Sequence, residues 1–149
     1  MAAHHQMGYD GLKDCCQTLC RPWSPFKQLN GMSTFTHPIT LHSASGGSEA
    51  EWRVMVDTGP TFTVVPSPVL GRLGFTPDDA VRLRLANGQV EHRGITEIEA
   101  NLNGTTRTII CVFGEPSAPP IIGAVTLELF LLGVDPVGQR LVPVDGLWM

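Results

Sequence analysis

The feature that most constrains this chain is an Asp-Thr-Gly tripeptide between two apolar stretches rich in β-branched residues. Residues 54–66 read V-M-V-D-T-G-P-T-F-T-V-V-P. Such runs predict buried strands, so the tripeptide must form a tight loop that presents the Asp57 carboxylate inside the protein. Burial of a lone carboxylate is costly unless hydrogen bonds or a partner compensate it. Gly59 has no Cβ and lets neighbouring groups approach, and the Thr58 hydroxyl can tie the loop to a neighbour. Asp57 is therefore a candidate catalytic acid. The alternative is an ordinary surface turn, which Asp and Gly both favour.

The chain from residue 35 onward consists of short strand patterns separated by turn signals. We expect strands at residues 35–41, 52–56, 61–65, 81–85, 89–94, 95–102, 107–113, 121–122 and 139–144. Two short helices are expected, one over 67–73 with Ser67 as its cap and one over 125–132. Asn-Gly pairs at 87–88 and 103–104 each predict a hairpin turn. Many strands with few helices predict an all-β domain.

Length and charge limit the domain organisation and the kinds of partner. A chain of 149 residues suggests one folded domain. We expect this domain at residues 32–149, because residues 1–31 have no sustained apolar periodicity and indicate a poorly ordered tail without a role in the chemistry. The net charge of −4 argues against a nucleic-acid partner. No apolar run approaches the ~18–20 residues that cross a bilayer, and no signal-peptide pattern is present. We therefore expect a cytoplasmic protein without a membrane partner.

The cysteines do not predict a disulfide framework or a metal site. Three of them lie in the tail near two histidines: Cys15, Cys16, Cys20, His4 and His5. Their spacing fits no common zinc pattern, so neither a metal nor a cofactor is expected. Cys111 lies within a predicted strand and is expected to be a small buried apolar residue.

The segment around Asp57 resembles the active-site loop of the retropepsin-like aspartic proteases. Their pattern is an apolar pair, Asp-Thr-Gly, a small residue and then an apolar strand. P-I-I-G-A-V-T-L-E at 120–128 is similar to the apolar-apolar-Gly strand and short helix that close the same fold. Residues 133–136 and 140–143 are similar to the terminal hairpin of small prokaryotic members, so the resemblance covers about residues 32–149. One departure is Pro60, where the family usually has Ala or Ser, since proline has no N–H to donate near the carboxylate.

The resemblance implies an acid-protease barrel or sandwich with one lobe per chain and one or two short helices. It also implies that Asp57 is catalytic and that Thr58 and Gly59 support its loop. Two carboxylates about 3 Å apart share one proton and can hydrolyse a peptide bond. The chain has a single Asp-Thr-Gly, so the second carboxylate is expected from another copy in a homodimer. The terminal strand at 139–144 is expected to join that interface.

The resemblance further implies a substrate-covering flap and a pocket wall. Ala86, Asn87 and Gly88 lie where the family carries its flap, and the alternative is an ordinary solvent-exposed hairpin. Ile121 and Ile122 would line the pocket, belong to the core, or do both. Two functions remain open from the sequence. One is an aspartic endopeptidase acting on a peptide or protein. The other is an inactive dimeric β-domain for peptide binding or assembly, with Pro60 marking the lost activity.

Overall fold

The computed structural model describes residues 34–46 and 49–148, all of which belong to one unit, Ser33–Met149. The tail predicted at residues 1–31 and its cysteine cluster lie outside the described residues. The described part contains nine strands and two short helices. The strands are β1 Phe35–His42, β2 Glu49–Val56, β3 Thr63–Pro66, β4 Asp79–Arg84, β5 Val90–Leu102, β6 Thr105–Gly114, β7 Ile121–Ile122, β8 Leu132–Asp135 and β9 Arg140–Pro143. The helices are α1 Ser67–Arg72 and α2 Ala124–Leu129. The predicted all-β class is confirmed.

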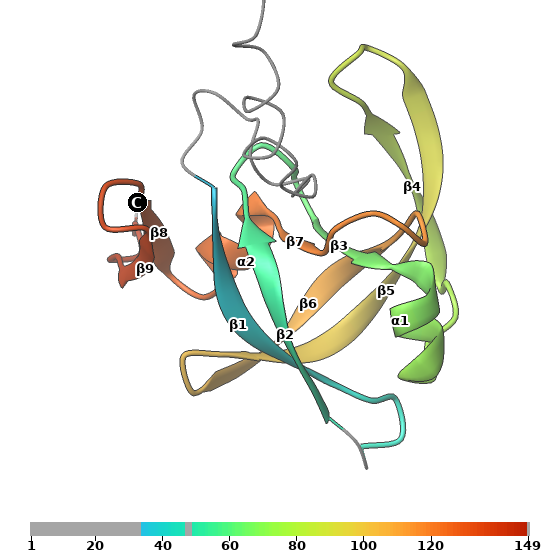
Figure 1. Ribbon diagram of the computed structural model, residues 1–149, viewed down its shortest axis with the longest axis horizontal. Helices are drawn as coiled ribbons and strands as arrows, with labels where there is room; N and C mark the ends of the chain where they lie inside the picture. Colours follow the sequence, from blue (N-terminus) through green and yellow to red (C-terminus); the bar gives the residue numbers. More distant parts are fainter. Residues whose placement is uncertain (1–33, 47–48, 149) are drawn as a thin grey trace, which may run out of the picture. The chain divides into compact units, whose positions relative to one another are not determined.

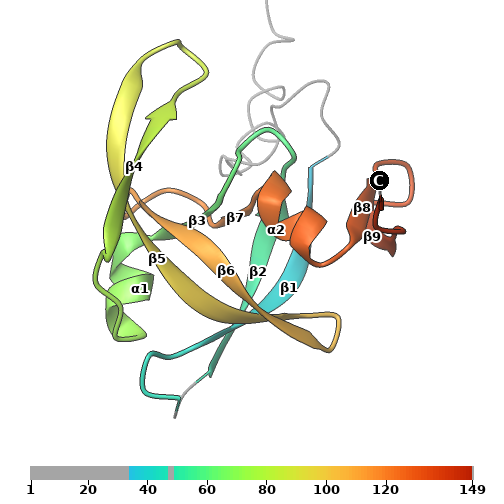
Figure 2. The same cartoon turned by 180° about the vertical axis from the view of Figure 1, so that it is seen from behind.

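Six of the strands close into a ring. The main sheet has the order β1-β2-β7-β3-β6-β5-β4, and β1 also pairs with β5 through Thr40–Asn101 and Leu41–Ala100. Strand β4 therefore lies outside the ring, paired only with β5, and the two form a long hairpin that projects from the sheet (Figure 1). Strands β8 and β9 form a separate two-stranded sheet near the C-terminus, which Figure 2 shows from behind.

Alternating apolar residues fill the interior of the ring. In β1 the buried side chains are Phe35, Ile39 and Leu41, which is the face that the period-two pattern predicts. Leu70 of α1 and Leu127 of α2 cover the core from outside the strands. Cys111 is fully buried, as predicted, and this burial raises the pKa of its thiol to about 12. The thiol is therefore a neutral packing group at ordinary pH.

Two local predictions are wrong in detail. Ser67 is the first helical residue of α1 and not its cap, and its hydroxyl donates instead to the carbonyl oxygen of Gly114 at 2.6 Å. The strands predicted at 89–94 and 95–102 are one continuous strand, β5. Gly94 does not end the first of them: it allows Pro77 to pack close, since a Cβ there would lie 2.7 Å from the Pro77 Cβ.

The second helix also ends earlier than the sequence pattern predicts. Helix α2 stops at Leu129, and Leu131 takes a left-handed φ of 53° that breaks the helix before β8 begins. The turn leaves Leu131 exposed, although the helical pattern places it on the buried side. Phe130 and Leu127 are buried as predicted.

Candidate active site

The loop that carries Asp57 connects β2 to β3, and it crosses the end of β7, which lies between these two strands in the sheet. Strand β2 leads into the loop at residues 57–62 and β3 leads away from it, yet β7 lies between them in the sheet. Ile121 is aligned with both Met55 of β2 and Val64 of β3. The loop must therefore pass over the chain where β7 ends and α2 begins, which explains why two distant sequence motifs meet here.

Asp57 is half-buried and is held by backbone atoms on both sides. Its own N–H donates to the carbonyl oxygen of Ile122 at 3.2 Å, and its Oδ1 accepts the N–H of Gly59 at 2.8 Å. A Cβ on residue 59 would lie 3.2 Å from that Oδ1, a tight contact. Glycine at this position therefore permits a turn that points a backbone donor at the carboxylate. Thr58 is exposed, and within residues 34–46 and 49–148 its hydroxyl makes no hydrogen bond.

Gly123 is the residue on which the loop rests. A Cβ there would lie 2.4 Å from both the carbonyl carbon and the carbonyl oxygen of Phe62, and 2.9 Å from the carbonyl oxygen of Pro60. No side chain fits that space without a movement of the loop. The next two residues, Ala124 and Val125, donate their N–H groups to the carbonyl oxygens of Pro60 at 2.9 Å and Thr61 at 3.0 Å. The loop carbonyls thus satisfy N–H groups that the first turn of a helix leaves unpaired.

A buried pair of threonine hydroxyls joins the end of the Asp57 loop to the start of α2. Thr63 Oγ1 and Thr126 Oγ1 are 2.8 Å apart, and Thr63 Oγ1 also accepts the N–H of Gly123 at 3.3 Å. Both threonines are buried. Sequence reasoning did not identify Thr63, Gly123 or Thr126 as part of the site. The glycine of the Ile-Ile-Gly motif was a signal that could have indicated close backbone packing.

The predicted site residues fall into two groups. Asp57, Gly59 and Ile122 meet at the loop, and the side chain of Ile122 is fully buried in the core, whereas Ile121 is half-buried. Ala86, Asn87 and Gly88 form the exposed tip of the β4–β5 hairpin, where Gly88 has a left-handed φ of 85°. The hairpin and the Asp57 loop extend toward the same end of the molecule in both views (Figures 1 and 2). Within the described residues, no hydrogen bond joins the hairpin tip to the loop.

Large apolar side chains are exposed on α2 and the C-terminal segment. We call this set the C-terminal apolar surface: Val125, Leu129, Leu131, Val144, Leu147 and Trp148. Leu147 and Trp148 are 96% and 98% exposed. The segments are joined, because the N–H of Val144 donates to the carbonyl oxygen of Leu131 at 2.9 Å. The surface also reaches the Asp57 loop through the bond from Val125 to Thr61. Six exposed apolar side chains on adjoining segments make this surface a candidate for an interaction site.

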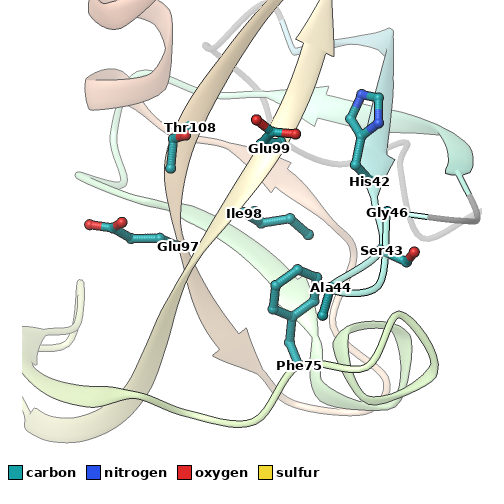
Figure 3. A pocket seen from close by; sticks show the side chains of 9 residues that line it. All are labelled: His42, Ser43, Ala44, Gly46, Phe75, Glu97, Ile98, Glu99 and Thr108. Atoms are coloured by element: carbon teal, nitrogen blue, oxygen red, sulfur yellow. The ribbon is translucent and has the colours of Figure 1, made fainter.

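A cavity of about 350 Å³ lies elsewhere in the fold, under the turn that follows β1. Its lining includes His42, Phe75 and Glu99, and Figure 3 shows Phe75 and Ala44 along one edge with His42 and Glu99 further up. Neither the Asp57 loop nor the hairpin tip lines this cavity. It is therefore separate from the candidate active site.

Within the described residues, no group of three or more His, Cys, Asp or Glu side chains is arranged to hold a metal ion. Over the same part of the chain, neither helix has the length and apolar character needed to span a bilayer.

Comparisons with known proteins place the fold. No protein-family model matches the chain, and none of the curated proteins matches it in sequence. Among solved structures, the chain is similar to EIAV protease in complex with the inhibitor HBY-793, with a TM-score of 0.50 and 15% identity over 77% of this chain and 98% of that chain. Simian foamy virus (mac) protease, in its solution structure, gives a TM-score of 0.45 and 13% identity over 63% of this chain and 94% of that chain. The likeness to EIAV protease and the mostly β architecture show a retropepsin-like fold with a single lobe.

Proposed function

We propose that this chain is an aspartic endopeptidase that hydrolyses peptide bonds as a homodimer, with Asp57 of each copy in one active site. The observation that carries the proposal is the Asp57 loop. It holds a carboxylate with a backbone donor at 2.8 Å and rests on a glycine that admits no side chain, within a retropepsin-like lobe. A surface turn could make the Gly59 bond, but it would not require the close packing of the loop on Gly123.

The chemistry needs two carboxylates. Two carboxyl groups about 3 Å apart cannot both ionise and so share one proton. The ionised member takes a proton from water, and the protonated member donates to the carbonyl oxygen of the scissile bond. The pair titrates as one unit, so neither residue has a pKa of its own. This reaction uses water and side chains alone and needs no cofactor.

A second copy is the source of the second carboxylate. The C-terminal apolar surface begins beside the Asp57 loop, at Val125, and continues to Trp148. A two-fold axis through this region would make the surface face itself and bring the two loops together. The exposed hydroxyl of Thr58 would then have a partner across the axis. The peptide substrate would lie between the loops and the β4–β5 hairpin of each copy, with Ile121 as part of the pocket wall.

A mixing experiment tests the shared site. Asp57→Asn keeps the shape of the side chain but removes its acid–base chemistry, so the pure variant should lose peptide cleavage by several orders of magnitude. Wild type and variant are then mixed in equal amounts at constant total concentration and allowed to exchange subunits. If both carboxylates are needed, activity should fall to about one quarter of the wild-type value, because only wild-type homodimers are active.

The mixing experiment has two outcomes that would contradict the proposal. An activity of about one half would mean that each chain acts alone, and wild-type activity in pure Asp57→Asn would exclude Asp57 as the catalytic residue.

The second candidate function is a dimeric β-domain that binds peptide without cleaving it. Pro60, which gives the loop no N–H at that position, is the observation in its favour. In that case wild type would dimerise and bind peptide but release no cleaved product.

A further inference from the structure

The β4–β5 hairpin stands largely by itself. Strand β4 pairs with β5 from Asp79–Ile95 up to Arg84–Val90, whereas β5 first pairs with β6 at Ile95–Val112. Residues 80–94 therefore have only each other as sheet neighbours. A two-stranded ribbon without further support is marginally stable in water. Its orientation relative to the ring must depend on the few contacts at its base (Figure 1).

Arg93 provides a polar contact between this ribbon and the ring. Its Nη1 donates to Glu115 Oε1 at 2.6 Å, while its Nη2 and Nε donate to Glu91 Oε2 at 2.5 and 2.9 Å. Within residues 34–46 and 49–148, no other hydrogen bond or ion pair joins a side chain of residues 80–93 to the rest of the protein. The side chains of Arg93 and Glu115 are 32% and 61% exposed. Hydrogen bonds to Glu115 first, and then to Glu91, raise the pKa of Arg93. A guanidinium group is in any case charged at ordinary pH, so both contacts are ion pairs.

Glu115 lies on the segment that leads into β7, the strand on which the Asp57 loop packs. It directly follows the buried Gly114, whose carbonyl oxygen accepts the hydroxyl of Ser67. The chain then runs through residues 116–120, where the carbonyl oxygen of Pro120 accepts the N–H of Met55, and enters β7. Figures 1 and 2 both show this segment passing beside the base of the hairpin. The pair thus links the hairpin to the element that supports Asp57.

We propose that the Arg93–Glu115 ion pair is a latch that sets the position of the hairpin over the active site, and that Arg93 is a positioning residue for substrate binding. This inference rests on the proposed peptidase function. With the latch closed, the hairpin leans toward the segment that carries β7 and covers a bound peptide. With the latch broken, a smaller fraction of the molecules has the hairpin in the covering position. The apparent affinity for substrate falls by the same factor as that fraction.

The test compares two neutralised glutamates. Glu115→Gln removes the negative charge that joins Arg93 to the ring. Glu91→Gln also removes one negative charge next to Arg93, but it affects only a contact within β5. We expect Glu115→Gln to raise KM roughly two- to fivefold with kcat within about twofold, because exposed ion pairs have modest strength. Glu91→Gln should change KM by less than about twofold, and 0.5 M salt should reduce the difference, because salt screens exposed charges. Arg93→Gln and the double variant Arg93→Gln/Glu115→Gln should match Glu115→Gln, since both residues act through one contact.

Hydrogen–deuterium exchange gives a readout that does not depend on activity. Amides of residues 80–94 should exchange roughly two- to fivefold faster in Glu115→Gln than in wild type or Glu91→Gln, with the ring strands unchanged. Equal exchange in the two glutamine variants would overturn the latch. Faster hairpin exchange with an unchanged KM would overturn its role in substrate binding. A wild-type protein that cleaves no peptide would instead count against the proposed function, and exchange would still decide whether the pair holds the hairpin.

Discussion

The replacement Gly123→Ala is the sharpest test of how the Asp57 loop is built. The added Cβ would lie 2.4 Å from the Phe62 carbonyl carbon and oxygen, and 2.9 Å from the Pro60 carbonyl oxygen. Carbon atoms that are not bonded to each other prefer separations of about 3.5–4.0 Å. The loop at residues 60–62 must therefore move by about 1 Å away from the start of α2.

The cost of that movement has two parts. Overpacking of a tightly filled site costs about 1–3 kcal/mol. The shift also weakens the bonds from Ala124 to Pro60 and from Val125 to Thr61, each of which contributes about 0.5–1.5 kcal/mol. Together these give a loss of about 2–6 kcal/mol in the free energy of unfolding. Peptide cleavage should fall further than stability alone explains, because Asp57 moves with the loop.

Urea denaturation at one fixed protein concentration measures the stability, since the proposed dimer would make the stability depend on concentration. The matched control is Gly71→Ala, where a Cβ in helix α1 meets nothing within 4 Å. That change should leave stability unchanged or raise it by about 0.5–1 kcal/mol, because alanine favours a helix more than glycine does. If Gly123→Ala were as stable and as active as Gly71→Ala, the close packing of the loop on Gly123 would be refuted.

Three further changes test neighbouring features. Thr126→Val should lower the free energy of unfolding by about 1–3 kcal/mol because it takes the hydroxyl partner from buried Thr63; Thr126→Ser should be milder, and equal losses in urea denaturation would contradict this. The Gly138 N–H first, and then Arg140, lower the pKa of Asp135 below its ordinary value of 3.8. The ionised carboxylate of Asp135 therefore stabilises the fold above pH 3.8, and this stabilisation is lost as the pH falls through the lowered pKa. Asp135→Asn should therefore be less stable than wild type at pH 7, with the difference disappearing at strongly acidic pH, and a pH-independent difference would argue against the charge. Pro60→Ala restores a backbone N–H near the Asp57 loop and should shift the acidic limb of the pH–rate profile to lower pH; identical profiles would show that this N–H has no effect.

The sequence predicts most of the elements because their signals are local. Alternation in β1 and the Asn-Gly pairs at residues 87 and 103 depend on neighbours within a few positions, and all appear in the structure. The misreading of Gly94 has a physical cause. A glycine in a strand indicates either an end or a close approach, and only the position of Pro77 in space decides between them.

The contacts that hold the site are not local, and the sequence does not predict them. Thr63 and Thr126 are 63 residues apart, and Arg93 and Glu115 are 22 apart. No periodicity links residues at such separations, because their meeting depends on the order of strands in the sheet. The Asp57 loop itself was recognised because its motif is contiguous. The contacts of the threonine pair and of the ion pair at the base of the hairpin follow only from the three-dimensional fold.

The described contacts of Asp57 explain how its loop accommodates Pro60. Both hydrogen bonds of Asp57 go to backbone atoms, those of Gly59 and Ile122. The loop is joined to α2 through the Pro60 carbonyl oxygen, which proline retains, and not through the N–H that proline lacks. Backbone bonds restrict a sequence only where a side chain would collide, so most positions of such a loop can change while the fold persists. This is consistent with a retropepsin-like fold at 15% identity to EIAV protease. It follows that the loop can keep its shape with proline at position 60, because its bond to α2 uses the carbonyl oxygen alone.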